Sequence, residues 1–150
     1  MSKFVYRMQN ILNIKYKLEE QAKTEFMLAN QILQEEEEKL QKLKDRKFSY
    51  EEAVRQLLRK HLEVDRIKEN QEAILRMDEF IIMQTACVND AKRQVEIKAA
   101  RLTELMQERK AQEKLKEKAF ENFLQEENAK ESKEIDELVS FTYGRKQREE

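Results

Sequence analysis

Few residues of this chain have the type and spacing that chemistry requires. His61 and Asp65 stand four positions apart, so on a helix they would share a face and could together ligate a metal ion. A lone histidine beside one solvated aspartate is usually no more than a hydrated pair of side chains. We therefore expect no metal site.

Catalysis and nucleotide binding are also disfavoured. Cys87 could act as a nucleophile only with a base beside it, and the only histidine is distant in sequence. Cys87 precedes Val88 and is expected to be a small, packed or half-exposed residue. The single glycine, Gly144, leaves no glycine-rich loop that could cradle a phosphate. We expect no enzyme activity and no cofactor.

One run of charge stands out, at Glu35 to Glu38. It is expected to form a solvated helix face, with Lys39, Lys42 and Lys44 nearby as compensation. A docking patch for a basic partner is the alternative interpretation.

The composition predicts long helices. The 150 residues include no proline and one glycine, and 41% are charged. Turns are therefore nearly absent, and the 39% of apolar residues suffice only for narrow seams between helices. With 30 basic and 31 acidic residues the net charge is −1, which favours neither nucleic acid nor an anionic membrane as a partner.

Nothing in the sequence predicts insertion into a membrane or secretion. The longest run of large apolar residues is FIIM at 80–83, far short of the roughly 20 that a membrane span needs. The N-terminus has no apolar region followed by a cleavage site, and one cysteine suits a reducing compartment. We expect a cytoplasmic protein.

A coiled-coil seam is the strongest pattern. Six aliphatic residues recur at seven-residue spacing: Ile67, Ile74, Ile81, Val88, Val95 and Leu102. Residues three positions further on are Met77, Ala91 and Leu105, interrupted by Asn70, Gln84 and Lys98. The pattern thins at Arg109, Gln112 and Lys116, and Phe120, Phe123, Leu124, Ile135 and Leu138 are expected to resume it. This is the a/d repeat of a two-stranded coiled coil.

The first helical segment has a weaker seam. Its apolar residues step by three and four: Phe4, Met8, Ile11, Leu18, Ala22, Ala29 and Leu43. Near Phe26 the register is predicted to shift by about one position, continuing through Ile32, Leu33 and Leu40. Ser49 with Glu52 fits a capping box and predicts a break there.

These patterns predict an all-α fold, a long antiparallel two-helix coiled-coil hairpin with a short helical or irregular tip. Residues 1–150 form a single hairpin with a first arm at 4–46, a tip region at 47–68, a second arm at 69–143 and a frayed tail at 144–150. A short helix at 50–62 is expected within the tip. Phe4 and Tyr6 are expected to lie near Phe141 and Tyr143 and to zip the open end. Phe80 flanks the seam and is expected to dock a partner or to pack on the tip helix.

Three stretches carry a resemblance to a known family. FVYRMQNILNIKYKLEEQAKTEF at the start, ERKAQEKLKEKAFENF, and KEIDELVSFTYGRK near the end resemble the flagellar export protein FliJ family over nearly the whole chain. The resemblance implies a stalk-like coiled coil of the flagellar type III export apparatus at the cytoplasmic face of the membrane. Its implied partners are the hexameric flagellar export ATPase, the linker of the export-gate membrane protein, and flagellar export chaperones. It also implies a chaperone-like role.

The resemblance also suggests two contact sets. The stripe associated with export-gate docking falls on Ala73, Met77, Phe80 and Gln84. Alanine stands there where a larger residue is common, and glutamine stands where histidine can occur. By analogy with stalk geometry, the predicted ATPase contact comprises Phe4, Arg7, Ile11, Ile135, Leu138, Phe141 and Arg145.

Two alternatives stay open from the sequence. An injectisome stalk protein would belong to the same class of machine. A self-assembling scaffold would instead use the seam between chains, because β-branched a positions also suit two-stranded coils formed by separate chains.

Overall fold

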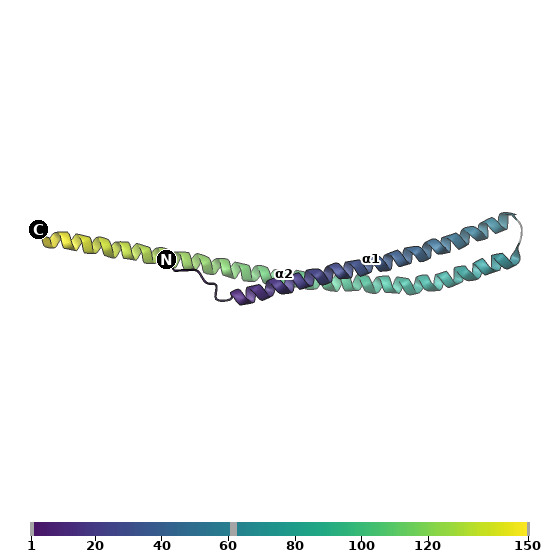
Figure 1. The fold of residues 1–150 in the computed structure, drawn as a ribbon, viewed down its shortest axis with the longest axis horizontal. Helices are drawn as coiled ribbons and strands as arrows, with labels where there is room; N and C mark the ends of the chain where they lie inside the picture. Colours follow the sequence, from purple (N-terminus) through teal and green to yellow (C-terminus); the bar gives the residue numbers. More distant parts are fainter. Residues whose placement is uncertain (1, 61–62, 150) are drawn as a thin grey trace. The chain divides into compact units, whose positions relative to one another are not determined.

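The computed structural model describes residues 2–60 and 63–149, and in that part the chain is all-α. Helix α1 spans Gln9–Lys60 and helix α2 spans Val64–Glu149, with 52 and 86 residues (Figure 1). No strand occurs among the described residues. Because the chain has no proline and one glycine, nothing within either helix interrupts the main-chain hydrogen bonding.

The chain divides into two compact units, each built from a segment of both helices. One unit comprises Met1–Glu19 with Leu105–Glu150, and the other comprises Glu20–Glu104. Within the second unit, Glu25 contacts Lys98 and Lys47 contacts Asp78, so α1 and α2 run antiparallel. The first unit is antiparallel too, since Phe4 meets Phe120 and Lys15 meets Glu108. The predicted two-helix antiparallel fold is confirmed.

The seam of α1 keeps one register throughout the helix. Its buried and half-buried residues alternate in steps of three and four: Leu12, Lys15, Glu19, Ala22, Phe26, Ala29, Leu33, Glu36, Leu40, Leu43, Lys47, Tyr50, Val54 and Leu57. The predicted register shift near Phe26 is therefore wrong. Four seam positions hold charged residues, Lys15, Glu19, Glu36 and Lys47. Because the prediction followed apolar residues only, it missed the continuous heptad repeat. Ile11, expected in the seam, is 42% exposed, whereas its neighbour Leu12 is 1% exposed.

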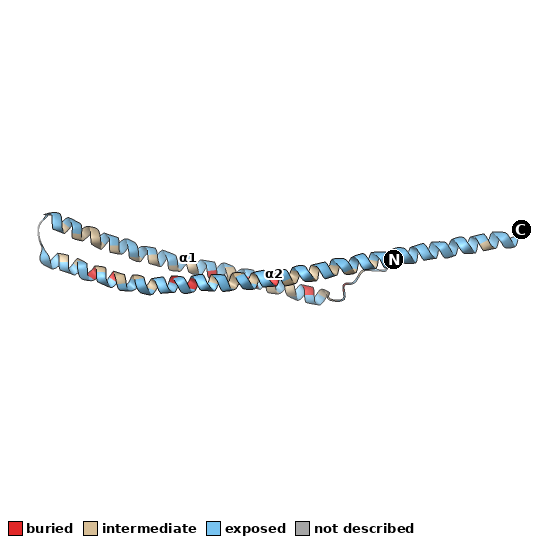
Figure 2. Cartoon of the chain, turned by 180° about the vertical axis from the view of Figure 1, so that it is seen from behind, coloured by how far each residue is buried: buried red, intermediate tan, exposed pale blue. Residues whose placement is uncertain are grey.

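The seam of α2 agrees with the sequence over most of its length. The six aliphatics from Ile67 to Leu102 are all buried or half-buried, as are the polar positions between them (Figure 2). The expected continuation fails further on. Leu124, Ile135 and Leu138 are exposed, because no described segment of α1 lies opposite them in their unit.

The predicted break at Ser49 is wrong. Helix α1 continues to Lys60, and the Ser49 hydroxyl donates to the main-chain oxygen of Asp45 at 3.2 Å, the bond of a serine within a helix rather than of an N-cap. Glu52 pairs with Arg55 instead of completing a capping box. The residues of the expected tip helix up to Lys60 belong to α1. One helix ends at Lys60 and the next begins at Val64, inside the 47–68 range expected for the reversal.

The end of the chain also differs from expectation. Helix α2 continues to Glu149, so helical structure does not stop at Gly144. A Cβ atom added at Gly144 would meet nothing within 4 Å, and its backbone has no positive φ, so glycine serves no steric need there. Residues 124–149 are hereafter called the α2 tail.

Candidate partner-binding surfaces

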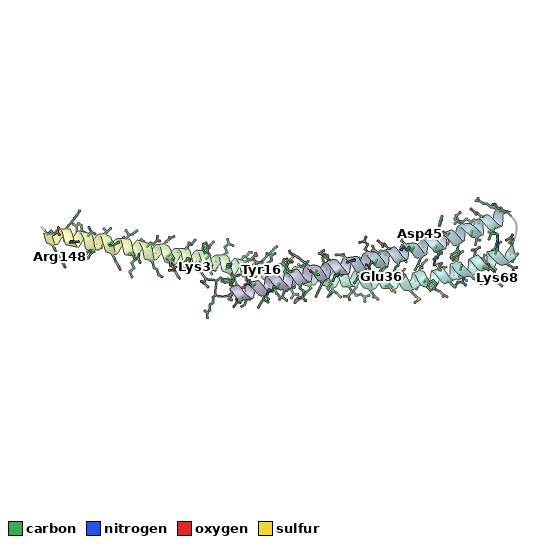
Figure 3. All side chains as sticks on the ribbon, viewed as in Figure 1. Lys3, Tyr16, Glu36, Asp45, Lys68 and Arg148 are labelled. Atoms are coloured by element: carbon green, nitrogen blue, oxygen red, sulfur yellow. The ribbon has the colours of Figure 1, made fainter. Side chains whose placement is uncertain are left out.

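A polar cluster interrupts the seam of the first unit. The Arg109 guanidinium donates to both carboxylate oxygens of Glu19, from Nε to Oε2 and from Nη2 to Oε1 at 3.3 Å. Its Nη1 donates to Glu113 at 3.1 Å, and the Tyr16 hydroxyl donates to the other oxygen of Glu113 at 2.5 Å. Glu19 is 4% exposed. Figure 3 places the labelled Tyr16 on the early part of α1.

The cluster perturbs the titration of its members. The Tyr16 hydroxyl, followed by Arg109, holds the pKa of Glu113 below its ordinary value of 4.5 despite partial desolvation. The same hydrogen bond raises the pKa of Tyr16 above 10.0. Glu19 chiefly raises the pKa of Arg109. A polar layer of this kind fixes helix register, because another alignment would separate the charges and leave Glu19 buried without the Arg109 guanidinium.

The N-terminal segment before α1 packs its aromatic residues on the middle of α2. The Phe4 ring lies 5.2 Å from that of Phe120 and 5.5 Å from that of Phe123, between centroids. Tyr6 is buried and donates to Gln112 Oε1 at 3.1 Å. The predicted zip between these residues and Phe141 and Tyr143 is therefore wrong. Both of the latter are exposed, because α2 is longer than α1 and extends past its partner.

The residues predicted to contact the ATPase do not form one cluster. Phe4 is engaged with α2, whereas Arg7 and Ile11 are exposed near the start of the chain. Ile135, the nearest predicted member on α2, lies twelve residues beyond Phe123, which is about 18 Å at the usual helical rise. The four residues of the set that share the α2 tail are Ile135, Leu138, Phe141 and Arg145.

The α2 tail is exposed along its described length except at the half-buried Glu127 and Gly144. Its exposed large apolar residues are Leu124, Ile135, Leu138, Val139, Phe141 and Tyr143. Figure 2 shows this end of α2 almost entirely in the colour of exposed residues, and Figure 3 shows no second helix beside Arg148. Arg145 makes only an exposed pair with Glu149 at 3.9 Å.

Most of the predicted gate-docking stripe faces α1. Ala73 and Met77 are buried, and Gln84 donates to the main-chain oxygen of Glu36 at 2.9 Å and to its carboxylate at 2.5 Å. This hydrogen bond is the main cause that lowers the pKa of Glu36. The three- and four-residue spacing that places these residues on one helix face places that face against α1, in the seam. Of the four predicted residues, Phe80 alone is exposed to solvent and could contact a partner, with 49% of its surface accessible.

One basic groove was not predicted from the sequence. A groove of about 580 Å³ is lined by Lys39, Lys42, Leu43, Asp45, Arg46 and Gln84. The three cations follow each other by three and four residues, so they share one helix face. Their spacing was a usable signal, but the two lysines were interpreted only as compensation for the preceding glutamates.

The cysteine, histidine and acidic residues considered in the sequence do not form a catalytic or metal site in the described part of the chain. Cys87 is a free, exposed thiol. Within residues 2–60 and 63–149, no three histidine, cysteine or acidic side chains are grouped so that they could hold a metal ion. The proposed His61 partner of Asp65 lies outside the described residues. No helix in the described part of the chain is long and apolar enough to cross a membrane.

Two antiparallel helices joined along a heptad seam with polar layers define an intramolecular coiled coil. The family model described as "Flagellar FliJ protein" matches residues 3–148, and the chain belongs to this family, whose members serve in flagellar protein export. No curated protein sequence matches the chain significantly. A solved structure, of a proposed YscO homologue (CT670) from Chlamydia trachomatis, has the same fold. It has a TM-score of 0.72 at 21% identity, and the match covers 99% of this chain and 100% of that one.

Proposed function

We propose that the chain is a stalk-like, non-enzymatic component of flagellar type III export that binds the hexameric export ATPase through the α2 tail and promotes its assembly and activity. It would act at the cytoplasmic face of the membrane at the flagellar base. Membership of the FliJ family supports the export role. The exposed α2 tail supports the choice of contact surface.

The apolar arc of the α2 tail is the observation on which the proposal rests. Ile135, Leu138 and Val139 are spaced three and four residues apart, so they lie on one side of the helix, with Phe141 beside them. All four are exposed, and no described residue covers them. Large apolar side chains gathered on one exposed helix face mark a surface for a protein partner.

A second contact, with the linker of the export gate, is assigned to Phe80. Its neighbour Met83, three residues on, is exposed on the same side. Ala73, Met77 and Gln84 are left out because the seam occupies them. Export chaperones are further proposed partners.

The alternatives have less support. The scaffold alternative required the seam for contacts between chains, but here α1 and α2 occupy it within one chain. An injectisome stalk protein would share this fold, and the likeness to the proposed YscO homologue concerns the fold alone.

The experiment is stimulation of ATP hydrolysis by the purified flagellar export ATPase. Wild-type chain should stimulate it, and Leu138→Ala/Phe141→Ala should remove most of the stimulation while helicity is kept. Leu75→Ala/Ile82→Ala, which truncates two exposed apolar residues of the other unit, is the matched control and should stimulate normally. If wild-type chain has no effect, the ATPase assignment fails. Full stimulation by the tail variant would move the contact elsewhere.

A further inference from the structure

The basic groove of the Glu20–Glu104 unit holds more positive charge than its own carboxylate can balance. Its three cations are Lys39, Lys42 and Arg46. The one carboxylate in its lining, Asp45, already accepts a hydrogen bond from Gln41 at 2.9 Å. Lys39 lies 3.4 Å from Glu36, whereas Lys42 and Arg46 are exposed and make no hydrogen bond or ion pair with any residue that the structure describes. These two side chains are therefore available to an anionic partner.

The α2 side of the groove supplies no counter-charge. Residues 80–89 of α2 include no charged side chain. Just before them, Asp78 is already paired with Lys47 at 2.6 Å. Glu79 lies five residues before Gln84, which lines the groove, so the two point about 140° apart around the helix. The positive charge of the groove is therefore not balanced from α2.

Exposed apolar side chains border the cations on α2. Phe80 lies four residues before Gln84, so the two share a helix face. Met83 follows Phe80 by three residues, and the two side chains are 49% and 67% exposed. A ligand seated in the groove would therefore meet cations on α1 and large apolar side chains on α2.

The spacing of the cations matches that of a helical ligand. Lys39 and Arg46 are seven residues apart, about 10 Å along α1, with Lys42 between them. Carboxylates spaced three and four residues apart on a partner helix would share one face and could meet all three cations. Glu35, which is exposed one turn before Lys39, limits the basic surface at that end. The groove lies between two helices, and an amphipathic helix seated in such a groove is a common mode of peptide recognition.

From these features we infer that the partner that contacts Phe80 presents an acidic amphipathic helix to the basic groove. Its carboxylates meet Lys39, Lys42 and Arg46, and a large apolar residue beside them packs on Phe80 and Met83. Complementary charge of this kind selects an acidic segment over a basic one and speeds its association. The inference rests on the proposed function in one respect, because the linker of the export gate is the segment proposed to contact Phe80.

The test is isothermal titration calorimetry of the full chain with a synthetic peptide that contains the linker of the cognate export-gate protein. The groove variant is Lys42→Glu/Arg46→Glu, which leaves the contact between Lys39 and Glu36 in place. Wild type should bind the peptide, and its affinity should fall as ionic strength rises. At low ionic strength the groove variant should bind at least about tenfold more weakly, and its affinity should depend less on salt.

A matched control and a charge-reversed peptide make the test specific. The control is Lys44→Glu/Arg59→Glu, which changes the net charge equally but alters exposed cations of α1 that do not line the groove. It should bind like wild type. A linker peptide whose acidic residues are replaced by lysine should bind the groove variant more tightly than it binds wild type. Circular dichroism checks that every variant keeps its helices.

Phe80→Ala distinguishes failure of this inference from failure of the proposed gate contact. If Phe80→Ala loses binding while the groove variant binds like wild type, the gate contact stands and the acidic helix is overturned. A control as weak as the groove variant would also overturn the inference, because affinity would then follow net charge and not the groove. So would a lysine-substituted peptide that wild type binds as tightly as the original. If wild type binds neither peptide, the proposed gate contact fails and the inference fails with it.

Discussion

Arg109 of α2 donates hydrogen bonds to both carboxylate oxygens of Glu19 of α1 inside the seam of their unit. The glutamate is nearly inaccessible to solvent, so this guanidinium replaces water as a source of stabilisation for its charge. Removing one partner of a buried ion pair is far more costly than keeping the pair, and an apolar pair at the same place is often no worse than the ion pair.

This relationship predicts an ordered series of thermal stabilities. Arg109→Leu should lower Tm by several degrees, because it leaves Glu19 buried without this guanidinium. Glu19→Leu/Arg109→Leu should recover most of that loss, because the buried carboxylate is then removed as well. Thermal unfolding followed by circular dichroism measures both. A double variant less stable than Arg109→Leu would show that the pair itself contributes more than the burial of its charges costs.

The seam position of Leu12 gives a second prediction. Leu12 is 1% exposed, so Leu12→Ala should reduce the free energy of unfolding by about 2–5 kcal/mol. Ile11→Ala removes similar apolar volume from an adjacent, partly exposed side chain and should cost clearly less. Denaturant unfolding of the two variants compares them directly. Equal losses would mean that the seam does not follow the register described above.

Lowering the pH should reduce the stability of the folded chain, because Glu113 and Glu36 become protonated. The pKa of each is lowered in the folded state, Glu113 chiefly by the Tyr16 hydroxyl and Glu36 chiefly by Gln84. A lowered pKa contributes stability above the unfolded value, near 4.5, that is lost as the pH falls through the folded value.

The measurement is the decrease in Tm between pH 7 and pH 3 for wild type, Glu113→Gln and Glu36→Gln. Each variant should show a smaller decrease than wild type, because one carboxylate no longer titrates. An identical decrease in all three would contradict the assignment of acid sensitivity to these groups.

Continuity of α1 through Ser49 gives a further prediction. Ser49→Pro should cost about 3 kcal/mol or more, because proline removes a main-chain donor and clashes with the preceding turn. Ser49→Ala should stay within about 0.5 kcal/mol of wild type, since Ser49 is exposed and bonds only to its own helix. A proline variant as stable as wild type would indicate the helix break that the capping-box pattern predicted.

The all-α fold could be predicted from the sequence because composition alone nearly forbids turns. The α2 seam was equally predictable, since six aliphatics at heptad spacing are typical of a coiled-coil seam and rare elsewhere. The seam of α1 was misread where Lys15, Glu19, Glu36 and Lys47 occupy it, because a charged residue in a seam is recognisable only once its partner is known. Arg109 is 90 residues from Glu19 in the sequence, so no local sequence pattern predicts that the two residues pair.

The candidate surfaces were harder to predict for a related reason. Phe80 could be singled out because the seam did not need it, and its exposure agrees with that reasoning. Ala73, Met77 and Gln84 face α1 rather than solvent, and their spacing alone could not tell the two apart, because residues spaced for one face can face either solvent or the other helix. Exposure of Phe141 depended on where the chain reverses. Because α1 ends at Lys60 and α2 begins at Val64, no described residue of α1 lies opposite the end of α2 in its unit.

Contact between the α2 tail and the export ATPase is tested most directly by site-specific photocrosslinking. A photoreactive amino acid is placed at position 141 in the tail or at position 82, an exposed position of the other unit, and the chain is mixed with the purified hexameric ATPase. We expect a crosslink to the ATPase from position 141 and none from position 82. Crosslinks from position 82 alone, or from neither position in an ATPase that the chain still stimulates, would contradict binding through the tail.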